Sequence, residues 1–125
     1  MNVLLVALGG AIGSAARYLM GAFIANRFGP DFPWGTFAVN VSGSFLIGVI
    51  LSFVGGGMLP AWARPFLAVG IMGGYTTFST YNYETLQLIQ GGEFGAAAFN
   101  TLGQVVAGLA GVYLGVVVAR TLGGI

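Results

Sequence analysis

Histidine, cysteine and lysine are absent from the 125 residues of this chain, and only 6% of its residues are charged. Without histidine and cysteine the chain has no imidazole for acid–base chemistry, no thiolate nucleophile, no disulfide and none of the usual ligands of zinc. With no lysine and a net charge of +1, it has neither a basic patch for nucleic acid nor a polybasic lipid anchor. We therefore expect no enzyme and no nucleic-acid-binding protein.

Hydrophobic residues, in contrast, make up 57% of the chain, and its mean hydropathy is +0.92. Soluble domains carry about 25% charged residues, so this chain cannot cover a water-facing surface. The composition predicts an all-α membrane protein, because helices satisfy their own backbone groups in lipid.

Hydropathy divides the chain into four apolar stretches, each longer than the ~20 residues needed to cross the hydrocarbon core as a helix. The stretches are roughly 2–25, 35–56, 65–90 and 94–120. The first has no basic start and carries Arg17, so we interpret it as a retained helix and not a signal peptide. The sequence predicts one multi-pass transmembrane domain over residues 1–125, with lipid as its surroundings.

Glycine accounts for 23 residues, and small or polar residues recur at helical spacing along three of the stretches. These stripes are Gly9, Gly13, Arg17 and Gly21; Thr36, Asn40, Ser44 and Gly48; and Asn100, Gln104, Gly108, Gly111 and Gly115. Small residues let helix backbones approach closely in lipid, so close packing explains most of the glycines.

The polar members of the stripes need more than packing. Arg17 costs at least ~2.5–3.5 kcal/mol if it meets lipid at the helix centre. Its place on a glycine stripe favours a position facing protein or water, and a snorkelling arginine is the alternative. Asn40 has two N–H donors and an acceptor, which suit either an interhelical hydrogen bond or a ligand.

Residues 73–86 read GGYTTFSTYNYETL and concentrate polar groups in the third stretch. The Gly73–Gly74 pair predicts a helix break near residues 73–77. Broken backbone at membrane depth is tolerated only inside protein or beside a wet cavity. Beyond the break, Phe78, Tyr81 and Glu84 share one helical edge, with hydroxyl groups beside them. Aromatic ring edges and hydroxyls offer weak donors without a full positive charge, which suits an anion that must bind and then leave.

Three motifs then indicate a family. They are GGAIGSAARY (9–18), WGTFAVNVSGSFLIG (34–48) and GGYTTFSTYNYE (73–84). In this order and spacing the chain resembles the Fluc (CrcB) family of fluoride channels over essentially its whole length. The resemblance implies an antiparallel, dual-topology homodimer in the cell (inner) membrane, with two fluoride pores and a structural sodium ion at the dimer centre. Such a channel would export fluoride from the cytoplasm down its electrochemical gradient and lower fluoride toxicity.

The resemblance also implies roles for particular residues. Backbone carbonyls of Gly73 and Thr76 from both subunits would hold the sodium ion. Asn40 matches the family's pore asparagine, and Arg17 and Glu84 match its arginine and glutamate.

The remaining matched positions follow the break. Phe78 and Tyr81 occupy the positions of two phenylalanines whose ring edges face fluoride, and Ser79 and Thr80 match the hydroxyls beside them. Tyr81 departs from the family by adding a donor to the ring. Gln104 stands where a small hydroxyl is expected, and the sequence assigns it no role.

Loop charge is compatible with dual insertion. If both termini share one side, that side holds Arg64 and Arg120, and the other holds Arg27, with Arg17 nearer to it. Acidic residues count little in orientation, so the bias is about one residue. Four helices with polar stripes also enclose little space, and a second copy would give the stripes a shared interior.

The leading alternative is a proton-coupled exporter of the small multidrug resistance type, and a structural subunit of a larger complex is a further one. The exporter needs a titratable carboxylate in the middle of its first helix, where this chain has Arg17. The structural subunit leaves the cluster at 73–86 unexplained.

Overall fold

The computed structural model describes residues 2–125, and these residues form helices joined by short turns, without a strand. The elements are α1 (Asn2–Phe28), α2 (Trp34–Gly55), η1 (Arg64–Met72, wound as a π-helix), α3 (Gly73–Tyr75), α4 (Phe78–Gln90) and α5 (Phe94–Gly123). Since η1, α3 and α4 together make the third hydrophobic stretch, the expected all-α chain of four helices is confirmed for the described residues.

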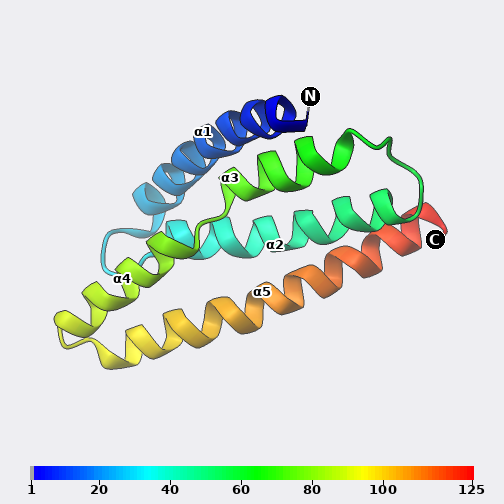
Figure 1. Ribbon diagram of the computed structural model, residues 1–125. Helices are drawn as coiled ribbons and strands as arrows, with labels where there is room; N and C mark the ends of the chain where they lie inside the picture. Colours follow the sequence, from blue (N-terminus) through cyan, green and yellow to red (C-terminus); the bar gives the residue numbers. More distant parts are fainter. Residues whose placement is uncertain (1) are drawn as a thin grey trace.

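Helices α2 and α5 lie side by side, and α1 lies against η1 and α3, with both chain ends toward the right-hand side of Figure 1. Helices α1, α2 and α5 are each long and apolar enough to cross a membrane. At 1.5 Å per residue the 22 residues of α2 extend about 33 Å, close to the ~30 Å of a hydrocarbon core. The third stretch reaches a similar length only through its two halves together.

The third helix is broken at Thr76 and Thr77, within the expected range but not at the glycine pair. Thr76 and Thr77 are extended (φ −86°, ψ 157° and φ −149°, ψ 114°), whereas Gly73 remains helical. The assignment of the break to the glycines was therefore wrong. Gly74 serves close packing instead, since a Cβ there would lie 2.6 Å from the Gly10 carbonyl oxygen of α1. The β-branched threonines take the extended conformation, which such residues favour.

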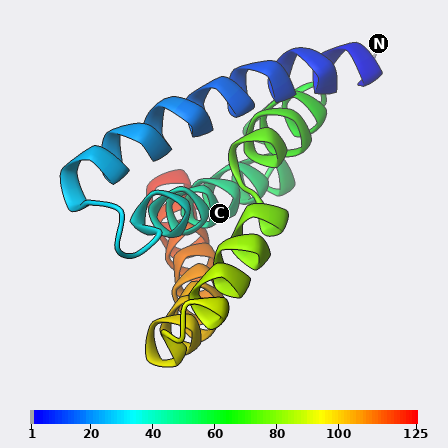
Figure 2. The same cartoon turned by 90° about the vertical axis from the view of Figure 1, so that its left-hand side faces the viewer.

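The break lets the third helix change partners. Its first half, η1 and α3, packs against α1, and its second half, α4, packs against α5. Figure 2 shows the two halves diverging at the break, with α4 descending beside α5. The break therefore lies where the chain passes from one helix pair to the other.

The small-residue stripes lie at the closest helix contacts. Gly9 of α1 is buried, and a Cβ on it would lie 2.9 Å from the Gly70 Cα of η1. Between α2 and α5, a Cβ on Gly115 would lie 3.2 Å from the Gly48 Cα. These contacts need residues without side chains, so packing accounts for this part of the glycine content.

Candidate ion pathway

Two cavities meet at the break. A cavity of about 630 Å³ lies between α1, α2 and α4, and its lining includes Arg17, Thr77, Thr80 and Glu84. A second cavity of about 230 Å³ is lined by Asn40, Gly43, Ser44, Ile47, Met72, Thr76, Thr77 and Phe78. Because Thr77 lines both, the extended residues of the break form the partition between the two spaces.

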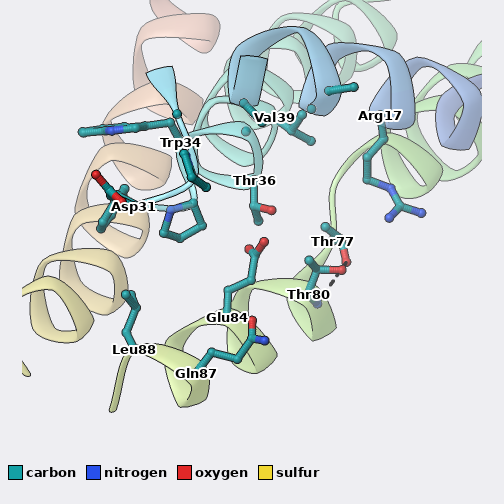
Figure 3. A pocket seen from close by; sticks show the side chains of 18 of the residues that line it. Arg17, Asp31, Trp34, Thr36, Val39, Thr77, Thr80, Glu84, Gln87 and Leu88 are labelled. Atoms are coloured by element: carbon teal, nitrogen blue, oxygen red, sulfur yellow. Dashed lines mark hydrogen bonds between the residues drawn. The ribbon is translucent and has the colours of Figure 1, made fainter. Parts of the chain in front are cut away.

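Thr77 caps the helix that follows the break. Its Oγ1 accepts a hydrogen bond from the Thr80 backbone N–H (3.3 Å) and donates to Thr80 Oγ1 (3.0 Å). Such N-caps are worth about 0.5–2 kcal/mol. The Thr80 hydroxyl accepts from Thr77, so its own proton remains for another acceptor in the cavity that it lines (Figure 3).

The side chain of Asn40, on α2, is hydrogen-bonded to the backbone of Thr77. Its Oδ1 accepts from the Thr77 backbone N–H (2.8 Å), and its Nδ2 donates to the Thr77 carbonyl oxygen (3.1 Å). The side-chain amide thus pairs with the extended backbone at two points. Thr77 N–H, which an unbroken helix would direct at the Gly73 carbonyl, is satisfied by Asn40 instead.

The second N–H of Asn40 is also used. Its Nδ2 donates to Gln104 Oε1 of α5 at 2.7 Å. Both donors of the Asn40 amide are therefore engaged within the chain. A donor role toward an anion requires that one of these hydrogen bonds be exchanged for the ion.

Arg17 reaches from α1 to the backbone of α3, directly before the break. Its Nε donates to the Gly74 carbonyl oxygen at 3.0 Å, and the side chain is half-buried. Hydrogen bonds from charged groups are worth about 1.5–3 kcal/mol. This contact supports the protein-facing interpretation of Arg17 over a snorkelling side chain.

Glu84 projects from α4 into the larger cavity. Figure 3 shows its carboxylate directed toward Thr36 of α2. Its Oε1 is buried and has no hydrogen-bond partner among the described residues. A buried polar atom of this kind needs a partner, and the adjoining cavity is large enough for water to supply it.

The two aromatic residues that follow the break differ in their surroundings. The rings of Phe78 and Tyr81 adjoin, with centroids 5.7 Å apart. Phe78 is 75% exposed, whereas Tyr81 is 7% exposed and its hydroxyl donates to the Thr101 carbonyl oxygen of α5 (2.8 Å). The hydroxyl that distinguishes tyrosine from phenylalanine is therefore bound to the backbone of α5. The neighbouring Ser79 is exposed.

The carbonyls of Gly73 and Thr76 are both released from helical donors. In an unbroken helix the Gly73 carbonyl would accept from Thr77 N–H, but that N–H donates to Asn40. The Thr76 carbonyl would accept from Thr80 N–H, but that N–H donates to Thr77 Oγ1. Gly73 is exposed, and a Cβ there would meet only the Ala68 carbonyl oxygen, 4.0 Å away. Two free carbonyls beside an open face suit a cation that prefers oxygen ligands.

The structure thus brings some of the predicted site residues together and separates others. Asn40, Phe78 and Thr76 line the smaller cavity; Arg17, Thr80 and Glu84 line the larger one; Tyr81, Ser79 and Gly73 line neither. Sequence reasoning missed Thr77, Thr85 and Asn100 as parts of the polar cluster and left Gln104 without a role. Of these residues, only Asn100 and Gln104 were indicated by the sequence, through the polar stripe of the fourth stretch.

The helices, their apolar surfaces and the polar break define a multi-pass helical membrane protein. The model of the family described as CrcB-like protein, Camphor Resistance (CrcB), matches residues 4–116. The chain therefore belongs to the CrcB family, as its motifs indicated.

Several bacterial relatives cover nearly all of the chain. It is similar to a protein of Anaeromyxobacter dehalogenans (49% identity over 98% of both chains) and to one of Thermus thermophilus (53% identity over 90% of this chain and 88% of the relative). A protein of Nitrobacter winogradskyi is 47% identical over 96% of both chains. All three carry the name fluoride-specific ion channel FluC, the name of a channel and not of an enzyme. Bacterial relatives are consistent with location in the inner membrane.

Proposed function

We propose that this protein is a fluoride-selective ion channel. The observation that carries the proposal is the polar break, where two cavities meet at Thr77 in a chain about half identical to proteins named fluoride-specific channels. Irregular backbone inside a membrane protein is a recurrent way of building an ion site.

The donors that we assign to fluoride, on α2 and at the start of α4, are weak and uncharged. A pore must replace the hydration shell of the ion and then release the ion. Ser79 and Thr80 offer hydroxyls, and Phe78 and Tyr81 offer ring edges with positive electrostatic potential. Asn40 contributes an amide N–H when one of its hydrogen bonds within the chain is exchanged. Since none of these groups carries a full charge, fluoride is bound weakly enough to move on.

A passive fluoride channel works as an exporter in a cell with a negative interior. Moving one elementary charge through 100 mV is worth about 2.3 kcal/mol, and this potential drives an anion outward. Fluoride that accumulates in the cytoplasm then leaves down its electrochemical gradient without an energy source in the protein. Lower internal fluoride means lower toxicity.

The active form that we propose is an antiparallel homodimer. Ser42, Ser79 and Asn82 are exposed in a single chain although they belong to membrane-spanning stretches. Polar groups at such depth are expected to face protein or water and not lipid. If both termini lie on the same side of the membrane, as their placement in Figure 1 suggests, the loop arginines are divided almost evenly between the two sides. Neither orientation is then strongly favoured during insertion.

A structural sodium ion fits the same arrangement. The released carbonyls of Gly73 and Thr76 lie next to the open face at Gly73. In a two-fold dimer each chain presents the same pair of oxygens, so the ion would join the two breaks at the centre. The sodium supplies a structural link and no chemistry.

Fluoride efflux from liposomes tests the proposed function. Purified protein is reconstituted into vesicles loaded with potassium fluoride, and efflux is started with valinomycin and followed with a fluoride electrode. The proposal predicts rapid efflux that is unchanged when a proton ionophore is added. No fluoride efflux, together with proton movement driven by a cationic substrate, would instead indicate an exporter of the multidrug type.

A further inference from the structure

Asn100 and Gln104 are the buried polar residues of the described chain, with 0% and 7% of their surface exposed. Buried polar side chains are almost always hydrogen-bonded, and each such group calls for an explanation. Both lie on α5 one turn apart, and the pathway described above uses neither of them as a ligand.

These two residues continue a chain of hydrogen bonds that starts at Asn40. Asn40 Nδ2 donates to Gln104 Oε1 (2.7 Å), and Gln104 Nε2 donates to Asn100 Oδ1 (2.9 Å). Asn100 Nδ2 then donates to Thr85 Oγ1 (2.9 Å), which donates to the Tyr81 carbonyl oxygen (2.8 Å). The chain thus links α2, α5 and α4.

Every bond in this chain runs in the same direction, from an N–H or O–H to the oxygen of the next group. A Gln104 amide with its oxygen and nitrogen exchanged would place two donors against each other at Asn40 and two acceptors against each other at Asn100. The orientation of Gln104 follows from its contacts with both Asn40 and Asn100, so it survives the loss of either contact, and its oxygen in turn restrains the Asn40 amide through the second N–H. In a low-dielectric interior such networks are worth more than their separate bonds.

The series of hydrogen bonds ends at Asn40, beside the partition between the two cavities. Asn40 holds the extended backbone of Thr77 at two points, and its hydrogen bond to Gln104 anchors the amide in the orientation that this pairing uses. We propose that Gln104 is a positioning residue that keeps the Asn40 amide oriented toward Thr77 and so maintains the break through which the ion passes. The link to ion passage rests on the proposed function; the control of Thr77 does not.

Three variants separate positioning from simple packing. Gln104→Met keeps an unbranched side chain of similar length and removes both hydrogen bonds. Asn100→Leu is nearly isosteric and leaves the Gln104 oxygen available to Asn40. Gln90→Met is the matched control, because Gln90 is exposed at the end of α4.

Two readouts are taken from the full-length protein: hydrogen exchange of the Thr77 amide by NMR in micelles, and fluoride efflux from liposomes. Thr77 lines both cavities, and its backbone N–H is bonded to Asn40, so the exchange of this amide reports on that hydrogen bond. We expect Gln104→Met to speed Thr77 exchange at least tenfold and to lower efflux about tenfold. Asn100→Leu should change the Thr77 exchange rate and the fluoride efflux rate by less than threefold, and Gln90→Met should leave both rates unchanged.

Packing alone predicts the reverse order, because Asn100 is the more deeply buried residue. An effect of Asn100→Leu as large as that of Gln104→Met, or unchanged Thr77 exchange in Gln104→Met, would overturn the inference. If Gln104→Met does not assemble, Gln104→Glu takes its place, because it keeps the acceptor oxygen. The Thr77 exchange rate in Gln104→Glu must then stay within threefold of wild type, and a larger increase in that rate would also refute the role of Gln104. A wild-type protein without fluoride efflux would refute the proposed function while the exchange result still decided the role of Gln104.

Discussion

Replacing Tyr81 by phenylalanine removes the hydroxyl of this side chain and keeps its ring. That hydroxyl donates to the Thr101 carbonyl oxygen of α5 at 2.8 Å. Interhelical hydrogen bonds in membrane bundles average about 0.6 kcal/mol, with a maximum of about 1.7. We therefore expect Tyr81→Phe to lower stability by this amount. Its fluoride efflux should stay within about twofold of wild type, because the ring and its edge remain.

An aliphatic replacement removes the ring as well. The Phe78 and Tyr81 rings lie 5.7 Å apart, and aromatic pairs at such distances are worth about 0.5–1.5 kcal/mol beyond the area that they bury. Tyr81→Ile therefore loses this pairing, the hydrogen bond and the ring edge. We expect fluoride efflux to fall at least tenfold in both Tyr81→Ile and Phe78→Ile, while the dimer still assembles.

The assay is efflux from liposomes with matched protein content, with assembly checked by size-exclusion chromatography. Tyr113→Ile is the control, because Tyr113 on α5 is 70% exposed and the same chemical change there should leave efflux intact. If Tyr81→Phe loses as much efflux as Tyr81→Ile, fluoride meets the hydroxyl and not the ring. If both isoleucine variants conduct like wild type, the assignment of residues 73–86 to the fluoride pathway is wrong.

Three further predictions concern topology, the ion site and packing. Reporter tags at the C-terminus should be found on both sides of the membrane, and a single location would contradict the antiparallel dimer. Thr76→Val should retain the proposed sodium ion, seen as a density peak at oxygen-ligand distances in a crystal structure of the variant, whereas Gly73→Leu should lose it because its side chain would occupy the open face at Gly73; equal tolerance would count against the site. Gly13→Ala should destabilise the protein by about 1–3 kcal/mol through overpacking, since a Cβ there would lie 2.9 Å from the Tyr75 backbone nitrogen; Gly10→Ala, with no such contact in the chain, should not.

The sequence was most informative where a single helix carries the signal. Apolar length sufficed for the four helical stretches, because a helix in lipid must be long and apolar whatever its neighbours. The glycine stripe of α1 likewise predicted a close contact, which the structure shows between Gly9 and Gly70. The cost of exposing Arg17 to lipid favoured a protein-facing position, and it bonds to Gly74.

The features that escaped sequence reasoning depend on partners distant in the chain. The break lies at Thr76 and Thr77 and not at Gly73–Gly74, because Asn40, 37 residues earlier, satisfies the Thr77 backbone. The pairing of Asn40 with Gln104 spans 64 residues, and no local pattern encodes it. The exposure difference between Phe78 and Tyr81 also depends on α5, which covers only one of two aromatics on the same helical edge.

The most direct test of the central claim is the voltage dependence of fluoride movement through the wild-type protein. Reconstituted vesicles with equal fluoride on both sides are given potassium diffusion potentials of either sign, and fluoride and chloride are followed separately. The account predicts fluoride movement that reverses with the sign of the potential, without proton coupling and with chloride left behind. Fluoride movement that ignores the potential, or chloride that passes equally well, would contradict a passive fluoride-selective channel.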